Sequence, residues 1–169
     1  MPRIMRAASG PGCRDNDAMT LRIATRADTA ELWRVRYAVT ENTLTPGRIG
    51  DAELHAYLED YGRGWVVELA PHPALRIAGF AIGDARNGHI WAMFVDPALH
   101  GQGYGRQLHD VMVDWLFAQG HTRLDLATEP NSRAEAFYRR AGWQPTGEGL
   151  DRWGDQPFEL HLNDWQRHA

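Results

Sequence analysis

The stretch VDPALHGQGYGRQLHDVMVDWL, residues 95–116, places three alternating glycines directly before a helical pattern. Its apolar residues recur at helical spacing, and they are Leu108, Val111, Met112, Trp115 and Leu116. They predict a long helix that stops at Gly120, because glycine is typical of helix ends. Glycine disfavours the interior of a helix, so Gly101, Gly103 and Gly105 at its beginning need another explanation.

The start of this helix differs from the starts of two other predicted helices. Those two combine an oxygen cap with an acid in the first turn, in the pairs Asp28 with Glu31 and Ser132 with Glu135. The helix after Gly103 has neither, and its first turn carries Arg106, which the helix dipole disfavours unless an anion lies there. Glycines also let an anion approach unpaired backbone N–H groups. The pattern indicates a phosphate-binding loop, with a flexible loop and incidental glycines as the alternative.

Two common phosphate motifs do not fit this stretch. The glycine spacing differs from G-x-G-x-x-G, and G-x-x-x-x-G-K-[ST] is impossible because all eighteen basic residues of the chain are arginine. Dinucleotides and nucleoside triphosphates bound in those two ways are therefore disfavoured as ligands.

The stretch resembles the signature of the GNAT superfamily of acyl-CoA-dependent N-acyltransferases, which is Gln or Arg, two residues, Gly, one residue, then Gly or Ala. The chain reads HGQGYG, with His100 at the Gln/Arg position. Backbone groups make most of the pyrophosphate contacts in such a loop, so this departure concerns one side chain. The similarity extends to further residues on both sides, namely Val95-Asp96-Pro97, Asn131, Ala134, Phe137, Tyr138 and Ala141-Gly142-Trp143.

The order of predicted elements over residues 20–163 is β-α-α-β-β-β-α-β-α-β-β, which is also the order in that family. The expected strands cover residues 21–28, 65–70, 76–83, 89–95, 122–128, 143–146 and 158–162, and the other helices begin after Asp28, at Asp51 and at Ser132. The fold class is α+β, with a mixed, centrally splayed β-sheet flanked by helices. We expect residues 1–19 to be a disordered tail and residues 20–165 to be a single domain.

The resemblance implies that acetyl-CoA is the acyl donor. Its pantetheine arm would lie between the strand HIWAMFV, residues 89–95, and the strand TRLDLAT, residues 122–128. The residues assigned to cofactor binding are Met93, Phe94, Val95, His100, Gly101, Gln102, Gly103, Tyr104, Gly105, Arg106, Asn131 and Tyr138. Asn131 would contact the pantetheine amide or order the turn before Ser132.

Acyl transfer needs an unprotonated amine, a donor for the developing oxyanion and a proton for the departing thiolate. The resemblance implies a backbone N–H near Phe94 or Val95 as the oxyanion donor and Tyr138 as the acid, with a core aromatic as the alternative for Tyr138. In a strand, residues 89, 91, 93 and 95 share one face. His89 is therefore predicted to lie beside Met93. Several members of the family that the chain resembles carry a glutamate or histidine at about this point of the strand, so the resemblance implies that His89 is the general base, with Glu68, Glu129 or bulk water as alternatives.

Composition narrows the class of protein further. A chain of 169 residues, 43% of them apolar, suits one domain with a sizeable core. The single cysteine, Cys13, excludes an internal disulfide and a cysteine-based zinc site, and no ligand spacing joins the histidines, so no metal is expected. There is no apolar run long enough to span a membrane and no pattern of a secretion signal, so a cytoplasmic location without a membrane partner is expected.

The expected partner is a primary amine of a small molecule or peptide. The formal net charge of −4 argues against a nucleic-acid partner, including aminoacyl-tRNA. Acidic residues between Glu41 and Tyr61 could attract a cationic amine, although a solvated helix face is the more common reason for such residues. Assembly as a homodimer is left open, and a non-catalytic acyl-CoA sensor or interaction module is the alternative function, because fold does not fix function.

Overall fold

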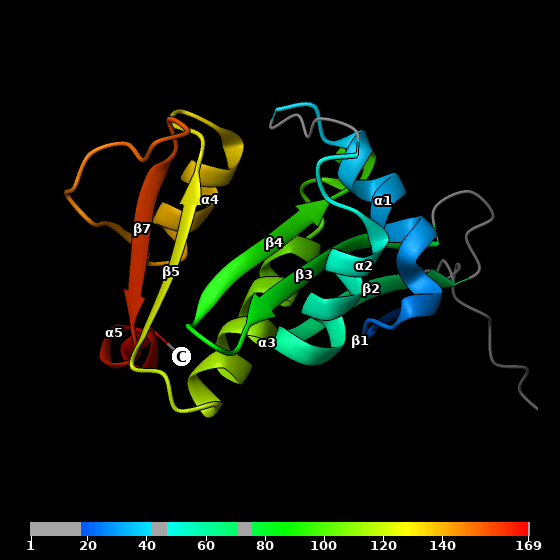
Figure 1. Cartoon of the computed structure of the whole chain (residues 1–169), viewed down its shortest axis with the longest axis horizontal. Coiled ribbons are helices and arrows are strands. Elements are labelled where there is room, and N and C mark those ends of the chain that lie inside the picture. Colours follow the sequence, from blue (N-terminus) through cyan, green and yellow to red (C-terminus); the bar gives the residue numbers. More distant parts are fainter. Residues whose placement is uncertain (1–17, 42–46, 71–75, 169) are drawn as a thin grey trace, which may run out of the picture.

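The computed structural model describes residues 18–41, 47–70 and 76–168. Within them, one sheet has seven strands in the order β1-β2-β3-β4-β5-β7-β6 (Figure 1). The strands are β1 (Ala18–Ile23), β2 (Gly62–Ala70), β3 (Ile77–Asp84), β4 (His89–Val95), β5 (Arg123–Thr128), β6 (Gln144–Pro145) and β7 (Gln156–His161). The α-helices are α1 (Thr29–Ala38), α2 (Asp51–Ala56), α3 (Tyr104–Ala118), α4 (Arg133–Arg140) and α5 (Leu162–His168). Short helical turns cover Arg26–Asp28, Tyr57–Tyr61 and Pro97–Leu99. The predicted α+β class with a mixed sheet and flanking helices is confirmed.

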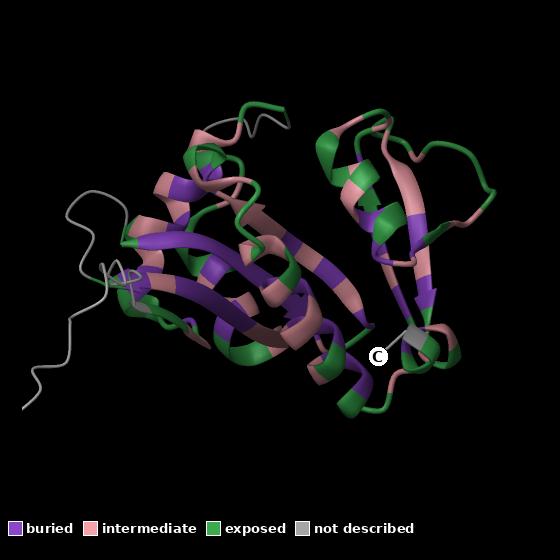
Figure 2. Ribbon diagram, turned by 180° about the vertical axis from the view of Figure 1, so that it is seen from behind, coloured by how far each residue is buried: buried purple, intermediate pink, exposed green. Residues whose placement is uncertain are grey.

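Helices cover both faces of the N-terminal half of the sheet. Leu32 and Val35 of α1 belong to one buried apolar cluster, and Leu108 and Met112 of α3 belong to another. Strand β3 runs between the two clusters, which explains its almost uninterrupted apolar sequence, and it is buried along its whole length (Figure 2). The helical spacing of apolar residues in α3 therefore has the expected cause, the burial of one helix face.

The sheet separates between β4 and β5. Strands β3 and β4 pair along their whole length, but the parallel pairing of β4 with β5 is confined to His89 and Asp125. Beyond that pair the two strands diverge toward their carboxyl ends (Figure 1). The predicted central splay is therefore present.

A β-bulge at Trp91 shifts the faces of β4. Ile82 pairs with Ala92 and Gly83 pairs with Ile90, so Trp91 is the additional residue on the β4 side. A bulge bends its strand and increases its twist. It also shifts the alternation of side chains, which matters for the residues that face the site.

The predicted cap of α1 is wrong. The Asp28 side chain accepts from the Thr25 N–H at 2.9 Å and from Arg22 Nη2 at 2.8 Å, while Glu31 Oε2 accepts from the Ile77 N–H at 3.2 Å. Both carboxylates therefore bind partners outside the first turn of α1. The cap of α4 is confirmed, because Ser132 Oγ accepts from the Glu135 N–H at 3.1 Å.

Two predicted boundaries are wrong. Strand β1 begins at Ala18, so the last two residues of the expected tail are ordered in the sheet, and residues 1–17 lie outside the described residues. Helix α5 was not predicted, and it carries the domain to His168. Its Trp165 is buried in the main apolar cluster, so tertiary packing fixes this short helix.

We predict that Asp28→Asn lowers the free energy of unfolding at pH 7 by about 2 kcal/mol, the range of a hydrogen bond to a charged group. Burial raises the pKa of Asp28, but the hydrogen bonds from Arg22 and Thr25 outweigh it and bring the pKa below its ordinary value. Because the pKa of Asp28 is lower in the folded than in the unfolded state, its ionised carboxylate stabilises the fold. This stabilisation is fully present above the unfolded pKa of about 4 and is lost as the pH falls through the folded-state pKa. The free energies of unfolding of the two proteins in urea should therefore converge as the pH falls through the folded-state pKa of Asp28. The exposed Asp60→Asn is the control, and a difference that persists undiminished at low pH would contradict the assignment.

Candidate active site

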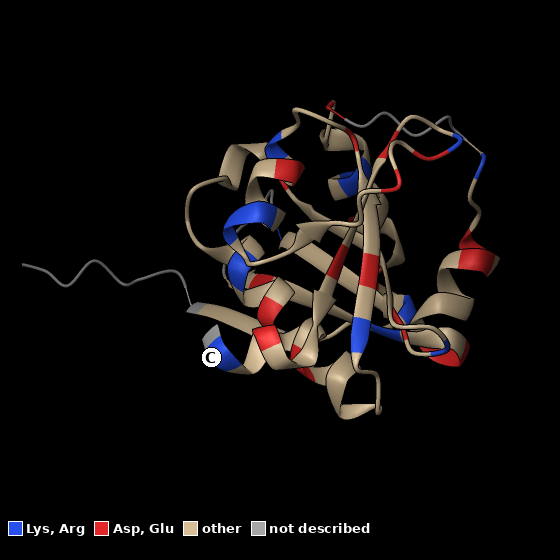
Figure 3. Ribbon diagram, turned by 90° about the vertical axis from the view of Figure 1, so that its left-hand side faces the viewer, with Lys and Arg blue, Asp and Glu red and all other residues tan. Residues whose placement is uncertain are grey.

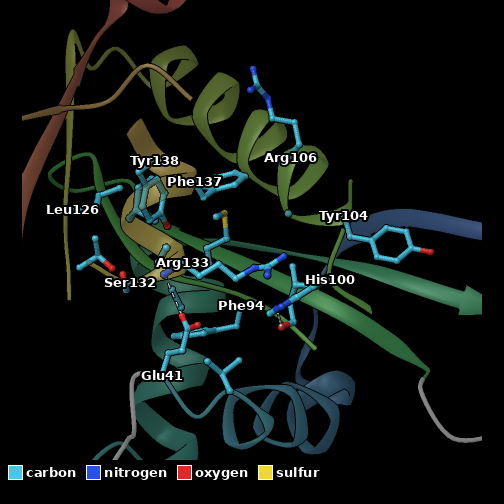
Figure 4. Close-up of a pocket in the computed structure, with 18 of the residues that line it drawn as sticks. Glu41, Phe94, His100, Tyr104, Arg106, Leu126, Ser132, Arg133, Phe137 and Tyr138 are labelled. Carbon is cyan, nitrogen blue, oxygen red and sulfur yellow. Dashed lines mark hydrogen bonds between the residues drawn. The ribbon is translucent and has the colours of Figure 1, made fainter. Parts of the chain in front are cut away.

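A cavity of about 380 Å³ lies where β4 and β5 separate (Figure 4). Its walls come from both strands, from the glycine-containing segment before α3 and from α4. Because β4 has no β5 partner beyond His89, the edge of β4 that faces the cavity is free of ladder pairing to β5 there. The cavity is therefore bordered by backbone groups as well as by side chains.

The glycine segment adopts a conformation that favours glycine. Gly101 has φ +79° and Gly103 has φ +84°, and a Cβ at either position would meet nothing within 4 Å. The requirement is thus for a left-handed backbone rather than for space. Gly103 is also the N-cap of α3, so no side-chain oxygen caps the helix at that position, as the sequence indicated. The first turn of α3 is left open to an external anion.

Asp96 fixes the chain before the glycine segment. Its side chain accepts from the Ala98 N–H at 2.9 Å and from Arg34 Nη1 of α1 at 2.7 Å, and Asp96 is buried. A buried carboxylate with these two partners holds the turn between β4 and α3 in one conformation. The role of Val95-Asp96-Pro97 is therefore to position the loop that follows.

The residues predicted to bind the cofactor mostly meet at this cavity. Those that line it are Met93, Phe94, Val95, His100, Gly101, Gly103, Tyr104, Gly105, Arg106 and Tyr138. His100 projects into it, with Nε2 donating to the Val95 carbonyl at 3.1 Å, whereas Tyr104 and Arg106 point outward from α3 (Figure 4). The Arg106 guanidinium donates to Asp110 at 2.9 Å.

Gln102 and Asn131 are not among the lining residues. Gln102 is exposed and accepts from the Tyr104 hydroxyl at 3.2 Å. Asn131 has a left-handed backbone with φ 60°, and its N–H donates to the Glu135 carboxylate. Of the two roles expected for Asn131, the structure displays the ordering of the turn before α4.

Tyr138 lies on the α4 side of the cavity and is 6% exposed. Its ring packs edge-on against Phe137 and Trp143, with ring centroids 5.4 Å and 5.8 Å away. Burial raises the pKa of its hydroxyl, so the group is protonated at neutral pH. In this state it can donate a proton but cannot act as a base.

His89 is not among the lining residues. It lies at the closed end of the cleft, with Nδ1 2.8 Å from Asp125 Oδ2. The prediction that it shares a face with Met93 and Val95 is wrong, because the bulge at Trp91 interrupts the alternation. Met93 and Val95 pack with Ile90 in the cluster under α3, whereas Ala92, Trp91 and Phe94 belong to the opposite cluster.

Arg133 is a lining residue that the sequence patterns did not select, and it meets Glu41, the first of the acidic residues considered for the acceptor side. The Arg133 side chain extends across the cavity toward His100, and its backbone N–H donates to Glu41 Oε2 at 3.3 Å (Figure 4). Arg133 is the first residue of α4, where the helix dipole disfavours a cation. An arginine in the first turn of a helix is also the feature that drew attention to Arg106. The same feature could have identified Arg133 as an anion-binding candidate.

A second cavity of about 680 Å³ adjoins the first, and Glu41 and Glu129 line both. Asp155, Arg48 and the 61% exposed Trp153 complete its charged and aromatic wall. Burial, with the charges of Asp151 and Glu129, raises the pKa of Asp155. Acidic and basic segments are interspersed over this view of the molecule (Figure 3). The alternative base Glu129 thus lies at the junction of the two cavities, whereas Glu68 pairs with Arg22 and Arg76 elsewhere.

Membrane and metal sites were also sought in residues 18–41, 47–70 and 76–168. No helix there has the length and apolarity to cross a membrane. The same residues contain no group of three or more His, Cys, Asp or Glu side chains placed to hold a metal ion.

Several solved structures of acetyltransferases share this fold. An acetyltransferase of the GNAT family from Staphylococcus aureus has a TM-score of 0.69 at 18% identity, with 86% of this chain and 99% of that chain covered. The structure of yncA from Salmonella typhimurium with its cofactor acetyl-CoA has a TM-score of 0.67 at 21% identity, covering 86% and 94%. The ribosomal-protein-S18-alanine N-acetyltransferase from Escherichia coli has a TM-score of 0.65 at 17% identity, covering 86% and 94%.

Sequence comparison gives the same family. A mycothiol acetyltransferase from Beutenbergia cavernae is 43% identical over 63 residues, which are 37% of this chain and 21% of that protein. This chain thus matches about a fifth of the length of that relative. The Acetyltransferase (GNAT) family matches residues 27–143, more than half of the chain. With the uncapped glycine start of α3, the splayed sheet and the cavity between them, the chain belongs to the GNAT acetyltransferase family.

Proposed function

We propose that the chain is an N-acetyltransferase that moves an acetyl group from acetyl-CoA to a primary amine of a small molecule or peptide, by direct attack in a ternary complex. The left-handed Gly101 and Gly103 before an uncapped helix, at the mouth of the cleft between β4 and β5, carry this proposal. Bound acetyl-CoA supplies the thioester carbonyl that the amine attacks. The residues present fit it, because the first turn of α3 is open to an anion and the unladdered edge of β4 offers backbone partners.

In this proposal the glycine segment before α3 and one arginine each from α3 and α4 hold the phosphates of acetyl-CoA. Backbone N–H groups from Gly101 to Gly105 bind the pyrophosphate, and Arg106 and Arg133 at the starts of α3 and α4 contribute positive charge. Met93, Phe94 and Val95 on β4 contact the pantetheine arm. A backbone N–H near Phe94 or Val95 donates to the oxyanion, where a fixed donor is most effective.

The alternative is an acyl-CoA sensor or interaction module on the same fold. A thiol-release assay with acetyl-CoA and a panel of amines, amino acids and peptides separates the two functions. Turnover supports the enzyme, whereas CoA binding by calorimetry without turnover supports the sensor. A cytoplasmic location and the absence of a nucleic-acid partner remain expectations from the composition.

The acceptor is proposed to be a cationic amine that enters through the second cavity. Glu41, Glu129 and Asp155 line that cavity, and beside them lies the Trp153 ring, on which the Arg152 guanidinium stacks with Cζ 3.9 Å from the ring centroid. A spermidine N-acetyltransferase chimera has a TM-score of 0.69 at 17% identity, which supports the fold but not the acceptor. Polyamines and peptides with a free amino terminus are therefore the first compounds to test.

We predict that Gly103→Asp abolishes binding of CoA and acetyl-CoA in calorimetry. The substitution places a carboxylate at the proposed phosphate site and a side chain on a left-handed backbone. Ala30→Asp, an exposed position in the first turn of α1, adds the same charge away from the cavity and should keep the affinity. Tight CoA binding by Gly103→Asp would contradict the proposed cofactor site.

We predict that Tyr138→Phe lowers kcat by about 10- to 1000-fold with little change in the KM for acetyl-CoA, because it removes only the proton donor. The buried hydroxyl is protonated at neutral pH, so it carries a proton that the departing thiolate can accept. Steady-state thiol release measures both constants, and the exposed Tyr37→Phe is the matched control. An unchanged kcat would assign Tyr138 to the core alone.

The general base is proposed to be Glu129, which lies at the junction of the two cavities. The position of His89 does not support the prediction that it is the base. We predict that Glu129→Gln lowers kcat/KM by about 100-fold, a typical contribution of acid–base catalysis. His89→Ala is the companion variant, and it should retain kcat/KM and its pH profile because His89 lies outside the lining of both cavities. The opposite result, a loss confined to His89→Ala, would restore His89 as the base.

A further inference from the structure

The C-terminal half of the sheet is attached to α3 by two tryptophan hydrogen bonds. Trp143 Nε1 donates to His109 Nε2 at 2.9 Å, and Trp165 Nε1 of α5 donates to Asp114 Oδ1 at 2.7 Å. We call these two the cross-cleft hydrogen bonds. The strand ladder supplies one residue pair between β4 and β5, and His121 bonds the Ala85 carbonyl at that same end of the cleft. The two tryptophan bonds add directional contacts between α3 and the C-terminal half.

His109 has a single protonation pattern that fits its partners. It is fully buried on α3, and its Nδ1 lies 2.7 Å from Asp110 Oδ1. The indole N–H of Trp143 can only donate, so Nε2 must be unprotonated and Nδ1 must carry the hydrogen. Burial lowers the pKa of His109, which keeps the imidazole neutral. The carboxylate of Asp110 also accepts from Arg106, so the bonded series runs from the start of α3 to Trp143.

Trp143 in turn contacts the proposed acid directly. Its backbone N–H donates to the Tyr138 carbonyl at 3.1 Å, and its ring lies edge-on to the Tyr138 ring. The His109 ring lies among four aromatic rings, with centroids 5.5 Å from Phe137, 6.4 Å from Tyr138, 6.2 Å from Trp143 and 5.6 Å from Trp165. Any shift of Trp143 relative to α3 therefore moves Tyr138 relative to the glycine segment.

We propose that His109 is a positioning residue, which through Trp143 fixes the distance of α4 from α3 and thereby places Tyr138 at the thioester. The inference rests on the proposed function. Apolar contacts alone allow two packed surfaces to slide, whereas a buried hydrogen bond with one donor and one acceptor selects one arrangement. A displacement of about 1 Å at a catalytic group is enough to cost about 100-fold in rate.

The test compares His109→Leu, Trp143→Phe and the double variant. His109→Leu leaves the Trp143 indole N–H without its acceptor, and Trp143→Phe leaves His109 Nε2 without its donor, so Tm falls in both single variants. The double variant places two apolar side chains against each other, so its Tm should recover. We expect kcat to stay about 10- to 100-fold low in all three, with the KM for acetyl-CoA nearly unchanged. His109→Gln, whose side-chain oxygen can accept from the indole, should recover part of kcat. Val66→Ala, buried on the opposite face of the sheet, is the control for lost stability alone.

A double variant that recovers kcat together with Tm would overturn the proposal, since His109 would then act on stability only. A second measurement does not depend on turnover. Amide hydrogen exchange of β5 and α4 should accelerate by about tenfold in His109→Leu relative to β2 and β3, the effect of one lost hydrogen bond. An equal change in exchange rate in both halves of the sheet would overturn the proposal, and this result does not require a known acceptor amine. Absence of turnover in the wild-type protein would contradict the proposed function instead.

Discussion

The interruption of the β4–β5 ladder is the constraint on which the rest of the structure depends. Two neighbouring parallel strands share the pair His89 and Asp125 and then diverge, which exposes backbone donors and acceptors of β4 inside the molecule. Buried backbone groups need partners, so the cleft is suited to a ligand with its own amides. The bulge at Trp91 accompanies this divergence, and it turns Met93 and Val95 toward α3 while Phe94 faces α1. The cavity is thus a consequence of how the strand is bent.

Helix α3 connects the consequences of that interruption. The N-terminus of α3, where the glycines have a left-handed backbone, lies at the mouth of the cleft. Leu108 and Met112 pack the helix against the N-terminal half of the sheet. Two further residues of α3, His109 and Asp114, accept hydrogen bonds from Trp143 and Trp165 of the C-terminal half. One helix therefore relates the proposed phosphate site to the helix that carries Tyr138. A rigid relation between the two is what a positioned acid requires.

The two cavities differ in their electrostatic character. The inner one has buried Tyr138, whose pKa is raised by desolvation, beside apolar strand residues. The outer one shares Glu41 and Glu129 with the inner one and adds Asp155, with only Arg48 as a lining cation among the residues described. A protonated donor on one side and carboxylates on the other suit an amine that arrives charged, loses a proton and attacks a thioester. The arrangement supports the proposed division into a cofactor side and an acceptor side.

Local patterns determined the elements and the glycine loop, because a helix start, a turn and an alternating strand depend on residues close in sequence. The uncapped start of α3 at Gly103, the Ser132 cap and the apolar face of α3 could all be predicted in this way. The prediction of the splay came from resemblance to a family rather than from spacing. Tertiary structure alone decided the facing of His89, since one inserted residue at Trp91 shifts the alternation and no local signal marked it. It also decided that Trp165 forms a helix and that Asp28 binds Arg22, because burial by distant segments selects partners that a linear pattern does not contain.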